Sequence, residues 1–385
     1  MPLQLPPLSL YIHIPWCIRK CPYCDFNSHA VKSDDTEGLP EKAYTAALMR
    51  DLETELNAVQ GREIETIFIG GGTPSLFSPQ ALRNILQGVA ERTPLAANAE
   101  ITMEANPGTF EQERFAGFLE AGVNRLSIGI QSFNDQHLQT LGRIHNSANA
   151  RHAVAAARQI GFTNINTDLM HGLPGQTPEQ ALNDLQTAID LAPEHLSWYQ
   201  LTIEPNTEFH SRPPRLPEDE TLWDIQEQGQ ALLAAHGYQQ YEISAYSQPG
   251  QTARHNLNYW QFGDYIGIGA GAHGKVTLAD QNQILRRWKH RQPKAYMQAI
   301  DPLSGLQAIT EAELPFEFMM NALRLHEGVS ADLYTPATGM PLSQITPLLQ
   351  QLRSRGLLVD DPQRIAPTEQ GRLFLNDLLE SFLAD

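Results

Sequence analysis

Short apolar runs alternate with longer segments of helical periodicity over residues 1–309. Several of the apolar runs end in glycine or polar residues before the next helical pattern begins. Strands that alternate with helical segments in this way are typical of β/α units around a parallel sheet. The pattern predicts six such strands, at residues 8–15, 66–70, 100–107, 125–132, 164–174 and 196–205.

The six predicted units favour an α/β fold, built as a partial or complete (β/α) barrel. In such barrels the chemistry lies at the carboxyl ends of the strands, and the singular polar and glycine-rich segments of this chain fall there. A doubly wound open sheet is the alternative architecture. It would need a phosphate-binding turn after the first strand, and the sequence has none at that place.

The pattern changes at two places further along the chain. Pro249 and Gly250 end the predicted barrel core of residues 1–250, and the glycine-rich residues 251–309 are expected to complete that core as loop and short strand. Residues 310–385 contain helical segments, then two short apolar runs and a last helix. Helices followed by a two-stranded wing predict a small C-terminal α+β domain of the winged-helix type.

An excess of acidic residues limits the partners of the chain. It has 44 Asp and Glu against 27 Lys and Arg, a formal net charge of −17. This charge opposes binding to phosphate backbones, so no nucleic-acid partner is expected. No apolar stretch is long enough for a transmembrane span, although peripheral attachment to a membrane stays open. The N-terminus lacks a signal-peptide pattern and the cysteines are clustered, which favours a cytoplasmic location.

All three cysteines, Cys17, Cys21 and Cys24, lie on one segment with the spacing C-x3-C-x2-C. Thiolates are soft ligands that suit iron–sulfur clusters, zinc or copper(I). Three thiolates on one loop can hold three corners of a 4Fe-4S cluster and leave one iron open to another ligand. A structural zinc site completed by His13 or His29 is the alternative, and a disulfide with a spare thiol is another. The spacing favours the cluster, because zinc ligands usually come as two pairs.

This segment resembles the signature of radical S-adenosylmethionine (SAM) proteins, in which an aromatic residue, here Tyr23, precedes the last cysteine. The resemblance implies that the amino and carboxylate groups of SAM chelate the open iron. It also implies that the reduced cluster cleaves SAM to a 5′-deoxyadenosyl radical, while the protein supplies binding, orientation and exclusion of water. The fold it implies is a partial barrel of the radical SAM type.

Two further segments fit a SAM site. Gly71, Gly72 and Thr73 follow the second predicted strand, and glycine lets a backbone approach a ligand closely. The resemblance implies that this loop faces the methionine end of SAM, whereas a tight strand-to-helix turn is the alternative. Glu104 ends an otherwise apolar strand, where its carboxylate could bind the amino group or ribose of SAM. The alternative for Glu104 is a buried charge paired at the mouth of the barrel.

Motifs along nearly the whole chain resemble the oxygen-independent coproporphyrinogen III oxidase group of radical SAM proteins. They are Tyr11-Ile-His-Ile-Pro with the cysteines, Gly-Gly-Gly-Thr-Pro, Glu104-Ala-Asn-Pro, Gly-Ile-Gln131-Ser-Phe-Asn, Gly-Arg143-Ile-His and Asp168-Leu-Met-His-Gly-Leu-Pro. The resemblance implies that Tyr11, the glycine loop and Glu104 bind the cluster-bound SAM or its surroundings. It implies that Gln131, Arg143 and Asp168 line a second SAM or substrate region.

Two features separate the branches of this family. The decarboxylating oxidases carry a further cysteine two residues after the third, and here that position is Phe26. The chain has instead His255-Asn-Leu-Asn-Tyr-Trp, an H-N-x-x-Y-W pattern that resembles the heme chaperone branch. The resemblance implies a protein that binds heme besides the cluster and SAM, and hands heme to acceptor proteins, respiratory enzymes among them. The alternative is the oxidative decarboxylase of coproporphyrinogen III itself.

His255 is the expected axial ligand of the heme, because a neutral imidazole is a standard ligand of heme iron. Tyr259 and Trp260 could pack against the porphyrin face. The segment follows a Pro-Gly break and precedes a glycine-rich run, so we expect an accessible loop at the barrel mouth. His273 lies in the same glycine-rich region and is the competing ligand. A core histidine beside two aromatic residues is the alternative role for His255.

Overall fold

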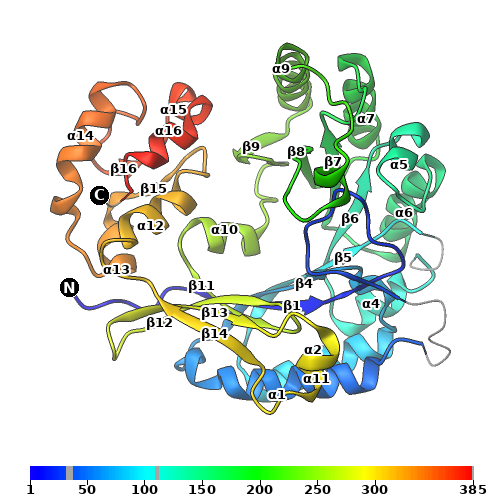
Figure 1. Cartoon of the computed structure of the whole chain (residues 1–385), viewed down its shortest axis with the longest axis horizontal. Coiled ribbons are helices and arrows are strands. Elements are labelled where there is room, and N and C mark those ends of the chain that lie inside the picture. Colours follow the sequence, from blue (N-terminus) through cyan, green and yellow to red (C-terminus); the bar gives the residue numbers. More distant parts are fainter. Residues whose placement is uncertain (32–37, 109–111, 384–385) are drawn as a thin grey trace.

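A computed structural model describes residues 1–31, 38–108 and 112–383 of the chain. Its main body is a sheet of twelve strands with helices outside it, and a smaller helical domain follows at the C-terminus (Figure 1). The strand order is β14-β13-β12-β11-β1-β4-β5-β6-β7-β8-β10-β9. Strands β14 and β9 form its two edges, so the sheet is open and the predicted partial barrel is confirmed.

Neighbouring strands from β11 to β8 run parallel and form the centre of the sheet. In β1 and β6 nearly every side chain is buried, whichever face of the sheet it points to. Parallel strands that are covered on both faces show this pattern, which explains their continuous apolar runs. The parallel strands are β1 (Leu8–Ile14), β4 (Ile64–Gly71), β5 (Leu95–Ala105), β6 (Arg125–Gln131), β7 (Ile165–His171), β8 (His195–Gln200) and β11 (Asp264–Ile268).

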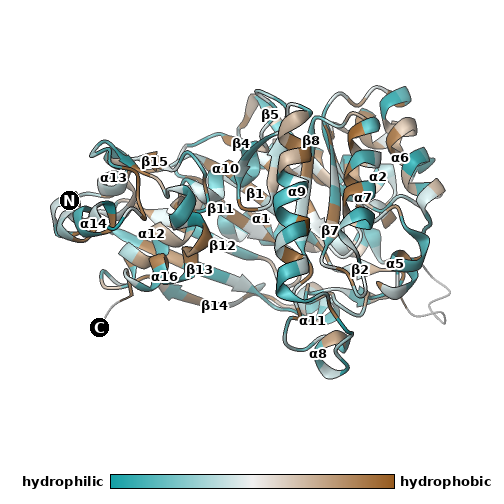
Figure 2. Ribbon diagram, turned by 90° about the horizontal axis from the view of Figure 1, so that it is seen from above, coloured by the Kyte–Doolittle hydropathy of each residue, from teal (hydrophilic) through white to brown (hydrophobic). Residues whose placement is uncertain are grey.

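Helices connect these strands, and polar caps mark where several of them begin. The Ser78 hydroxyl accepts a hydrogen bond from the N–H of Ala81 at 3.2 Å, and Thr177 forms a reciprocal capping box with Gln180. Figure 2 shows the outer side of α9 as largely hydrophilic. No helix in the described part of the chain has the length and apolarity of a membrane span. The connecting helices are α1 (Glu41–Val59), α2 (Pro79–Arg92), α4 (Phe115–Ala121), α5 (Asp135–Thr140), α6 (Ser147–Ile160), α7 (Pro178–Asp190), α8 (Glu208–Ser211) and α9 (Asp219–Ala235).

Antiparallel strands extend the sheet beyond both ends of its parallel part. Two short strands, β9 and β10, follow β8. On the other side a three-stranded meander continues from β11. The added strands are β9 (Gln239–Glu242), β10 (Ala245–Ser247), β12 (His273–Leu278), β13 (Gln283–Lys289) and β14 (Leu303–Ala308), with α11 (Pro293–Gln298) between β13 and β14.

The expected loop around His255 is wrong, because residues 251–309 are regular for most of their length. They begin with helix α10 (Arg254–Trp260), and β11 then pairs in parallel with β1. Glycine is required near the turn that follows: a Cβ on Gly267 would lie 1.9 Å from the carbonyl oxygen of His273. Gly269 has a φ of +110°, a conformation that side chains other than glycine rarely adopt. These glycines permit close packing of the main chain; they do not make the segment a flexible loop.

The C-terminal domain has its own hydrophobic cluster, which includes Phe318 and Tyr334. Leu3 joins this cluster, and the N–H of Gln4 donates to the carbonyl of Pro336 at 3.0 Å, so the start of the chain is anchored on its last domain (Figure 1). The predicted helices and wing are present, and the short strands β15 and β16 pair antiparallel. The elements are α12 (Leu314–Ala322), β15 (Val329–Ser330), α13 (Tyr334–Thr338), α14 (Thr346–Ser354), β16 (Arg364–Ile365), α15 (Glu369–Leu373) and α16 (Leu375–Glu380).

Candidate functional site

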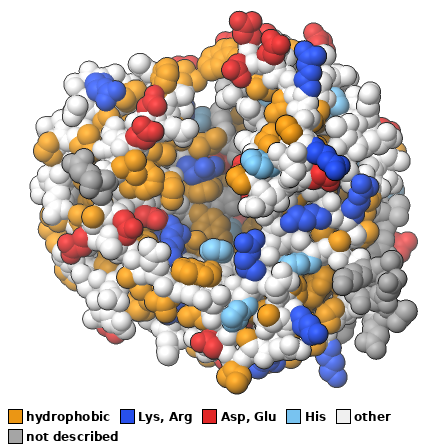
Figure 3. Space-filling view, viewed as in Figure 1, with side chains coloured by type: hydrophobic (Ala, Val, Ile, Leu, Met, Phe, Trp, Pro, Cys, Tyr) orange, Lys and Arg blue, Asp and Glu red, His pale blue; other side chains and the backbone are white. Residues whose placement is uncertain are grey.

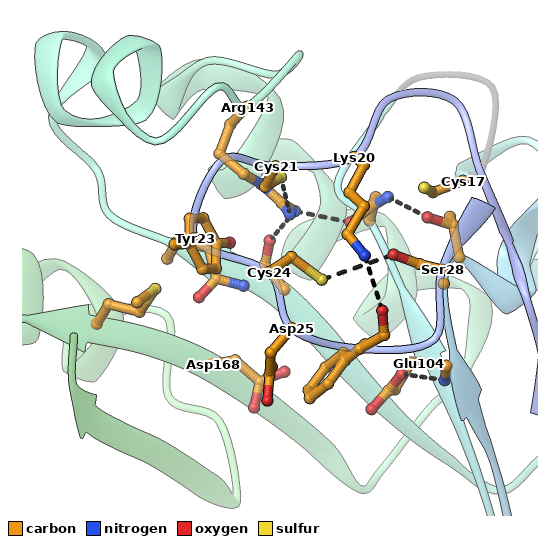
Figure 4. Close-up of a pocket in the computed structure, with 18 of the residues that line it drawn as sticks. Cys17, Lys20, Cys21, Tyr23, Cys24, Asp25, Ser28, Glu104, Arg143 and Asp168 are labelled. Carbon is orange, nitrogen blue, oxygen red and sulfur yellow. Dashed lines mark hydrogen bonds between the residues drawn. The ribbon is translucent and has the colours of Figure 1, made fainter. Parts of the chain in front are cut away.

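The segment that carries the cysteines leaves the carboxyl end of β1 and loops over the ends of the neighbouring strands (Figure 4). Strands β2 (Trp16–Cys17) and β3 (His29–Ala30) pair in parallel and close the base of this loop. The carbonyl of Pro22 accepts a hydrogen bond from the N–H of Phe209 at 3.0 Å, which ties the far side of the loop to the region after β8. The loop is therefore held from both sides above the sheet.

A cavity of about 470 Å³ lies between this loop and the carboxyl ends of β4 to β8, and we call it the cysteine cavity. The (β/α) barrel prediction placed the chemistry at these strand ends. The structure brings together there every predicted site residue except Tyr11 and His255. Those lining the cavity are Cys17, Cys21, Cys24, Gly71, Gly72, Thr73, Glu104, Gln131, Arg143 and Asp168.

The three cysteines are free thiols on the wall of this cavity. Burial raises the pKa of Cys17 to about 11 and also raises the pKa of Cys24, so a bound metal would have to displace these protons. Arg143 donates to the sulfur of Cys21 at 3.7 Å and places a positive charge beside a thiolate ligand (Figure 4). These groups fit an iron–sulfur cluster held on one loop.

The three thiols do not form a site for a single metal ion. Among the described residues, no three His, Cys, Asp or Glu side chains converge closely enough to hold one metal ion. Zinc would need four ligands around one point. A cubane meets each thiolate at a separate iron, so its ligands lie further apart. The arrangement of Cys17, Cys21 and Cys24 suits the second case.

The glycine loop packs against the end of β1 more closely than any other residue would allow. A Cβ on Gly72 would lie 2.4 Å from the carbonyl oxygen of Trp16, and one on Gly71 would lie 2.7 Å from Cε1 of His13. Gly71 also has a φ of +121°. The glycines are therefore needed for a tight turn, which was the alternative to ligand binding. The same turn forms part of the cavity wall, so both roles remain compatible.

Two half-buried carboxyl groups, Glu104 and Asp168, face the cavity (Figure 4). Burial, and next the negative charge of Asp168, raise the pKa of Glu104 to about 8, while the N–H of Gly71 donates to it at 3.0 Å. Burial also raises the pKa of Asp168, against hydrogen bonds from Ser127 at 2.9 Å and Asn166 at 2.8 Å. The donors to both carboxyl groups are neutral. A positively charged ligand would favour their ionised forms.

Gln131 ends β6 in a left-handed conformation with a φ of +71°, where the register with β7 shifts. A residue other than glycine in this region costs about 1–3 kcal/mol, and such strain clusters at binding sites. The side-chain oxygen of Gln131 accepts a hydrogen bond from the hydroxyl of Tyr199 at 2.8 Å. The strained turn therefore aims Gln131 toward Tyr199 of β8, one strand beyond the neighbouring β7.

The sequence prediction missed Tyr199 and Asn106, which both line the cysteine cavity. Asn106 accepts a hydrogen bond from Arg143 at 2.7 Å and donates to the Thr73 hydroxyl at 3.0 Å, so it connects two predicted site residues. Both missed residues stand at or just beyond the carboxyl end of an observed strand, Tyr199 in β8 and Asn106 after β5. The predicted strands extended to residues 205 and 107, so their ends did not mark these two positions for the barrel rule.

Two predicted residues lie outside the cysteine cavity. The hydroxyl of Tyr11 bonds with Nδ1 of His13 at 2.9 Å at the wall of a second cavity. His255 is only 1% exposed; its Nδ1 lies 2.7 Å from the Thr66 hydroxyl and its Nε2 lies 2.8 Å from the Tyr259 hydroxyl. The accessible position expected for His255 is therefore wrong, because its ring packs between α10 and the sheet. An iron atom could reach it only if α10 left the sheet.

The second cavity lies among α10, β1, β12 and β13, and we call it the aromatic cavity. Its volume is about 1010 Å³, and it shares Asp25, Phe26, Gly71 and Glu104 with the cysteine cavity. Figure 3 shows this face of the molecule hollowed near its centre, with hydrophobic, basic and histidine side chains around the hollow. Its aromatic lining includes Phe26, Tyr259, Trp260, Phe262, Tyr265 and Trp288.

Comparisons with known proteins cover the barrel and the C-terminal domain alike. The model of the radical SAM superfamily matches residues 11–188, and that of the HemN C-terminal domain matches residues 309–374. The chain is 55% identical over 383 residues to the heme chaperone HemW of Escherichia coli K12, with 100% of each chain covered. It is 35% identical over 387 residues to the heme chaperone HemW of Bacillus subtilis 168, covering 98% of this chain and 99% of that one.

Among solved structures, coproporphyrinogen III oxidase (HemN) from Escherichia coli, titled a radical SAM enzyme, is similar with a TM-score of 0.81 and 24% identity. The similarity covers 98% of this chain and 90% of that chain, and it shows the fold. The identities to the HemW proteins show a nearer relationship, because they are higher and extend over whole chains. The chain therefore belongs to the radical SAM superfamily and, within it, to the HemW family.

Proposed function

We propose that this protein is a heme chaperone that holds a 4Fe-4S cluster and SAM, binds heme and delivers it to acceptor proteins. The observation that carries the proposal is the 55% identity to the heme chaperone HemW of Escherichia coli over the complete chain. The geometry supports it with two adjoining cavities, of which one carries the cysteines and the other carries aromatic and basic side chains. Each cavity suits one of the two kinds of ligand.

In this proposal Cys17, Cys21 and Cys24 are the ligands of the cluster. The bound cluster supplies an open iron that SAM chelates and, after reduction, the electron for its cleavage. The main chain of the Gly71–Thr73 turn and the carboxylate of Glu104 then bind the methionine end of SAM. Glu104 suits a cationic ligand because its charge is buried beside Asp168 without a cation of its own among its hydrogen-bond partners.

Gln131, Arg143 and Asp168 are proposed to line the continuation of this SAM or substrate region. Arg143 has a second task, since it reaches both Cys21 and the carbonyl of Gly129, the latter at 2.7 Å. It couples the cysteine loop to the end of β6. Asp168 is held by donors from two strands and keeps a fixed direction toward the cavity.

Tyr11 is proposed to position the cysteine loop, and through this loop the surroundings of SAM. Its hydroxyl bonds with Nδ1 of His13, and Nε2 of His13 bonds with the carbonyl of Asn27 at 2.9 Å. Asn27 also donates to the carbonyl of Ala270 at 2.9 Å. Tyr11 therefore belongs to a chain of hydrogen bonds that fixes where the loop returns to the sheet, and it is a positioning residue.

Oxidative decarboxylation of coproporphyrinogen III is not favoured as the function. Phe26 occupies the position where the decarboxylating oxidases carry a further cysteine, and its side chain is 58% exposed at the junction of the two cavities. A phenyl ring offers neither a thiolate nor a proton donor. The full-length relatives are named heme chaperones, whereas the oxidase resembles the chain at 24% identity.

The partners proposed for the heme-loaded protein are heme-accepting proteins, respiratory enzymes among them by family resemblance, in the cytoplasm. Neither nucleic acid nor a membrane span enters this proposal. The formal charge of −17 opposes nucleic acid, and the described helices include no membrane span.

The proposal is tested on the full chain, reconstituted anaerobically with iron and sulfide and then titrated with hemin. The spectrum should show the cluster and a bound heme together, and the heme should move to an apo heme protein added in excess. Serum albumin loaded with hemin at the same concentration is the control for passive release. Failure to bind hemin would contradict the proposal. So would formation of protoporphyrinogen over many turnovers with SAM and reductant.

A further inference from the structure

The aromatic cavity contains a histidine that is placed quite differently from His255. His273 begins β12, is exposed to the cavity and stands opposite Trp288 of β13, with ring centroids 6.5 Å apart and planes 27° apart. No hydrogen bond to either ring nitrogen is present in the part of the chain that the structure describes. A neutral imidazole with a free nitrogen is a standard ligand of heme iron.

The other histidine of this cavity does not offer a free nitrogen. His13 bonds through Nδ1 with Tyr11 and through Nε2 with the carbonyl of Asn27. His255 lies behind the cavity wall, with Thr66 and Tyr259 as its partners. His273 is thus the histidine of this region whose ring could bind an iron without breaking a packed contact.

The basic residues of the aromatic cavity divide into those with a salt bridge to a carboxylate and those without one. Lys275 pairs with Asp264 at 2.8 Å, and Lys289 pairs with Asp51 and Glu55 at 2.6 Å. Arg286 pairs with a carboxylate of α12. Arg291, just after β13, has no salt bridge within the described residues and is exposed. Its guanidinium is free to bind an anionic group at the cavity mouth.

Resting on the heme chaperone function proposed above, we propose that the heme binds in the aromatic cavity with His273 as iron ligand and Arg291 as the partner of a propionate. Tyr259, Trp260 and Trp288 then supply apolar walls for the porphyrin. His255 is instead a structural residue that holds α10, and with it Tyr259 and Trp260, against the sheet. The H-N-x-x-Y-W segment therefore forms one wall of the site, and the iron ligand comes from β12.

The size and charge of the cavity agree with such a ligand. Its volume of about 1010 Å³ is at the upper end of the range of about 300–1,000 Å³ for small-molecule sites, as a large planar ligand requires. Partial burial, and next the charges of Arg291 and Arg286, lower the pKa of His273, which keeps its ring neutral. The two arginines therefore lie near the ring that would hold the iron.

The test compares hemin with iron-free protoporphyrin IX on the reconstituted full-length protein. His273→Ala should lower hemin affinity by at least about tenfold and shift the Soret band. Losing even a hydrogen-bond partner of a metal ligand costs about 10–100-fold in affinity. The same variant should bind protoporphyrin IX as wild type does, because that ligand has no iron. His273→Met keeps a ligand atom and should recover part of the affinity with a distinct spectrum.

Arg291→Gln should weaken hemin and protoporphyrin IX equally, by at most about fivefold, since exposed ion pairs contribute about 0.2–1 kcal/mol. His152→Ala, on the exposed side of α6, is the matched control and should change neither ligand. Both His273 and Arg291 are exposed, so their variants should fold normally.

The outcomes separate the inference from the function. If wild type binds hemin and His273→Ala binds it with the same affinity and spectrum, the heme lies elsewhere and the inference is overturned while the chaperone function stands. If His273→Ala loses protoporphyrin IX as well as hemin, the residue shapes the pocket and is not the iron ligand. If wild type binds no hemin at all, the function and the inference both fail.

Discussion

The two cavities share Phe26, Gly71 and Glu104 on their common wall, yet they offer their ligands opposite kinds of surface. The cysteine cavity is built from the ends of parallel strands and carries thiols and half-buried carboxyl groups. The aromatic cavity is built from the antiparallel extension and α10, and it carries broad rings and basic side chains. A cationic ligand suits the first cavity, and a flat ligand with carboxylates suits the second.

The pKa values of titratable groups are shifted in both cavities, and the shifts match this difference between the two surfaces. Burial and Asp168 raise the pKa of Glu104 to about 8 in the cysteine cavity. Partial burial and two arginines lower the pKa of His273 in the aromatic cavity. A bound cation would lower the first pKa again, whereas a bound iron requires the neutral form of the second group. Glu104 lines both cavities, so a cation bound in the first also changes the charge beside the second.

The largest expected effect is on the cluster. Replacing any one of Cys17, Cys21 or Cys24 with serine should remove the brown cluster absorption and the bound iron, because a hard hydroxyl replaces a soft thiolate. Iron and acid-labile sulfide analysis measures this. His152→Ala is the control, since His152 lies on the exposed side of α6 and does not line the cysteine cavity.

The same cysteine variants also test whether the cavities are independent. Hemin binding should persist in all three, since none of the cysteines lines the aromatic cavity. Full retention of the cluster in every serine variant would refute the ligand assignment. Loss of hemin together with the cluster would show that the two cavities form one coupled site.

Glu104→Gln should have the next largest effect, on SAM alone. Replacing a charged acceptor by a neutral one should weaken SAM binding by about tenfold to a hundredfold, because a hydrogen bond to a charged group contributes about 1.5–3 kcal/mol. The perturbation of the reduced cluster's EPR signal by SAM measures the effect. Cluster content should stay as in wild type, and a drop in it would place Glu104 in a structural role.

The pH dependence of stability should report the same carboxyl group. The folded pKa of Glu104 is about 8, above the value of 4.5 for a free side chain, so the folded protein keeps a proton that the unfolded chain releases. The contribution of this group is therefore complete below about pH 4.5 and is lost as pH rises to about 8. Urea unfolding of apo protein at several pH values should show a steeper fall for wild type than for Glu104→Gln. Equal slopes would contradict the buried state of Glu104.

His255→Ala should have the smallest effect on ligands and act on stability. It leaves the part-buried hydroxyl of Tyr259 without a partner and removes one of the two partners of the buried Thr66 hydroxyl, which should cost about 1–3 kcal/mol of unfolding free energy. Circular dichroism during urea unfolding measures this, with His152→Ala as the control. The Soret band of the variant that remains folded should match wild type. An altered Soret band with unchanged stability would restore His255 as the iron ligand.

Much of the barrel could be predicted from the sequence because its signals are local. Buried parallel strands require continuous apolar runs, and each such run marked a strand of the sheet. The carboxyl ends of parallel strands must meet at one edge, so Glu104, Gln131 and Asp168 could be expected near one another and near the cysteine loop. The structure places all of them around one cavity.

The predictions that failed had given residues an exposed or flexible role, because glycine and aromatic residues lie near them in the sequence. The glycines after β11 turned out to permit the close approach of Gly267 to His273 and of Gly269 to His13. These contacts join parts of the chain that pattern reasoning treats separately. Helix α10 packs on the sheet for the same reason: Glu100 of β5 accepts hydrogen bonds from the N–H groups of Arg254 and His255, at 3.2 Å and 3.1 Å.

The sequence by itself determined the cysteine segment and the alternation of strands and helices, since spacing along the chain is enough to specify them. Only the tertiary structure decided whether each histidine faces the aromatic cavity or lies behind its wall. His255 and His273 both stand in a region rich in glycine and aromatic residues, and one is buried with two partners while the other faces a cavity. Burial depends on which distant strands pack together, here β1, β4 and β12, and that information is spread over the whole chain.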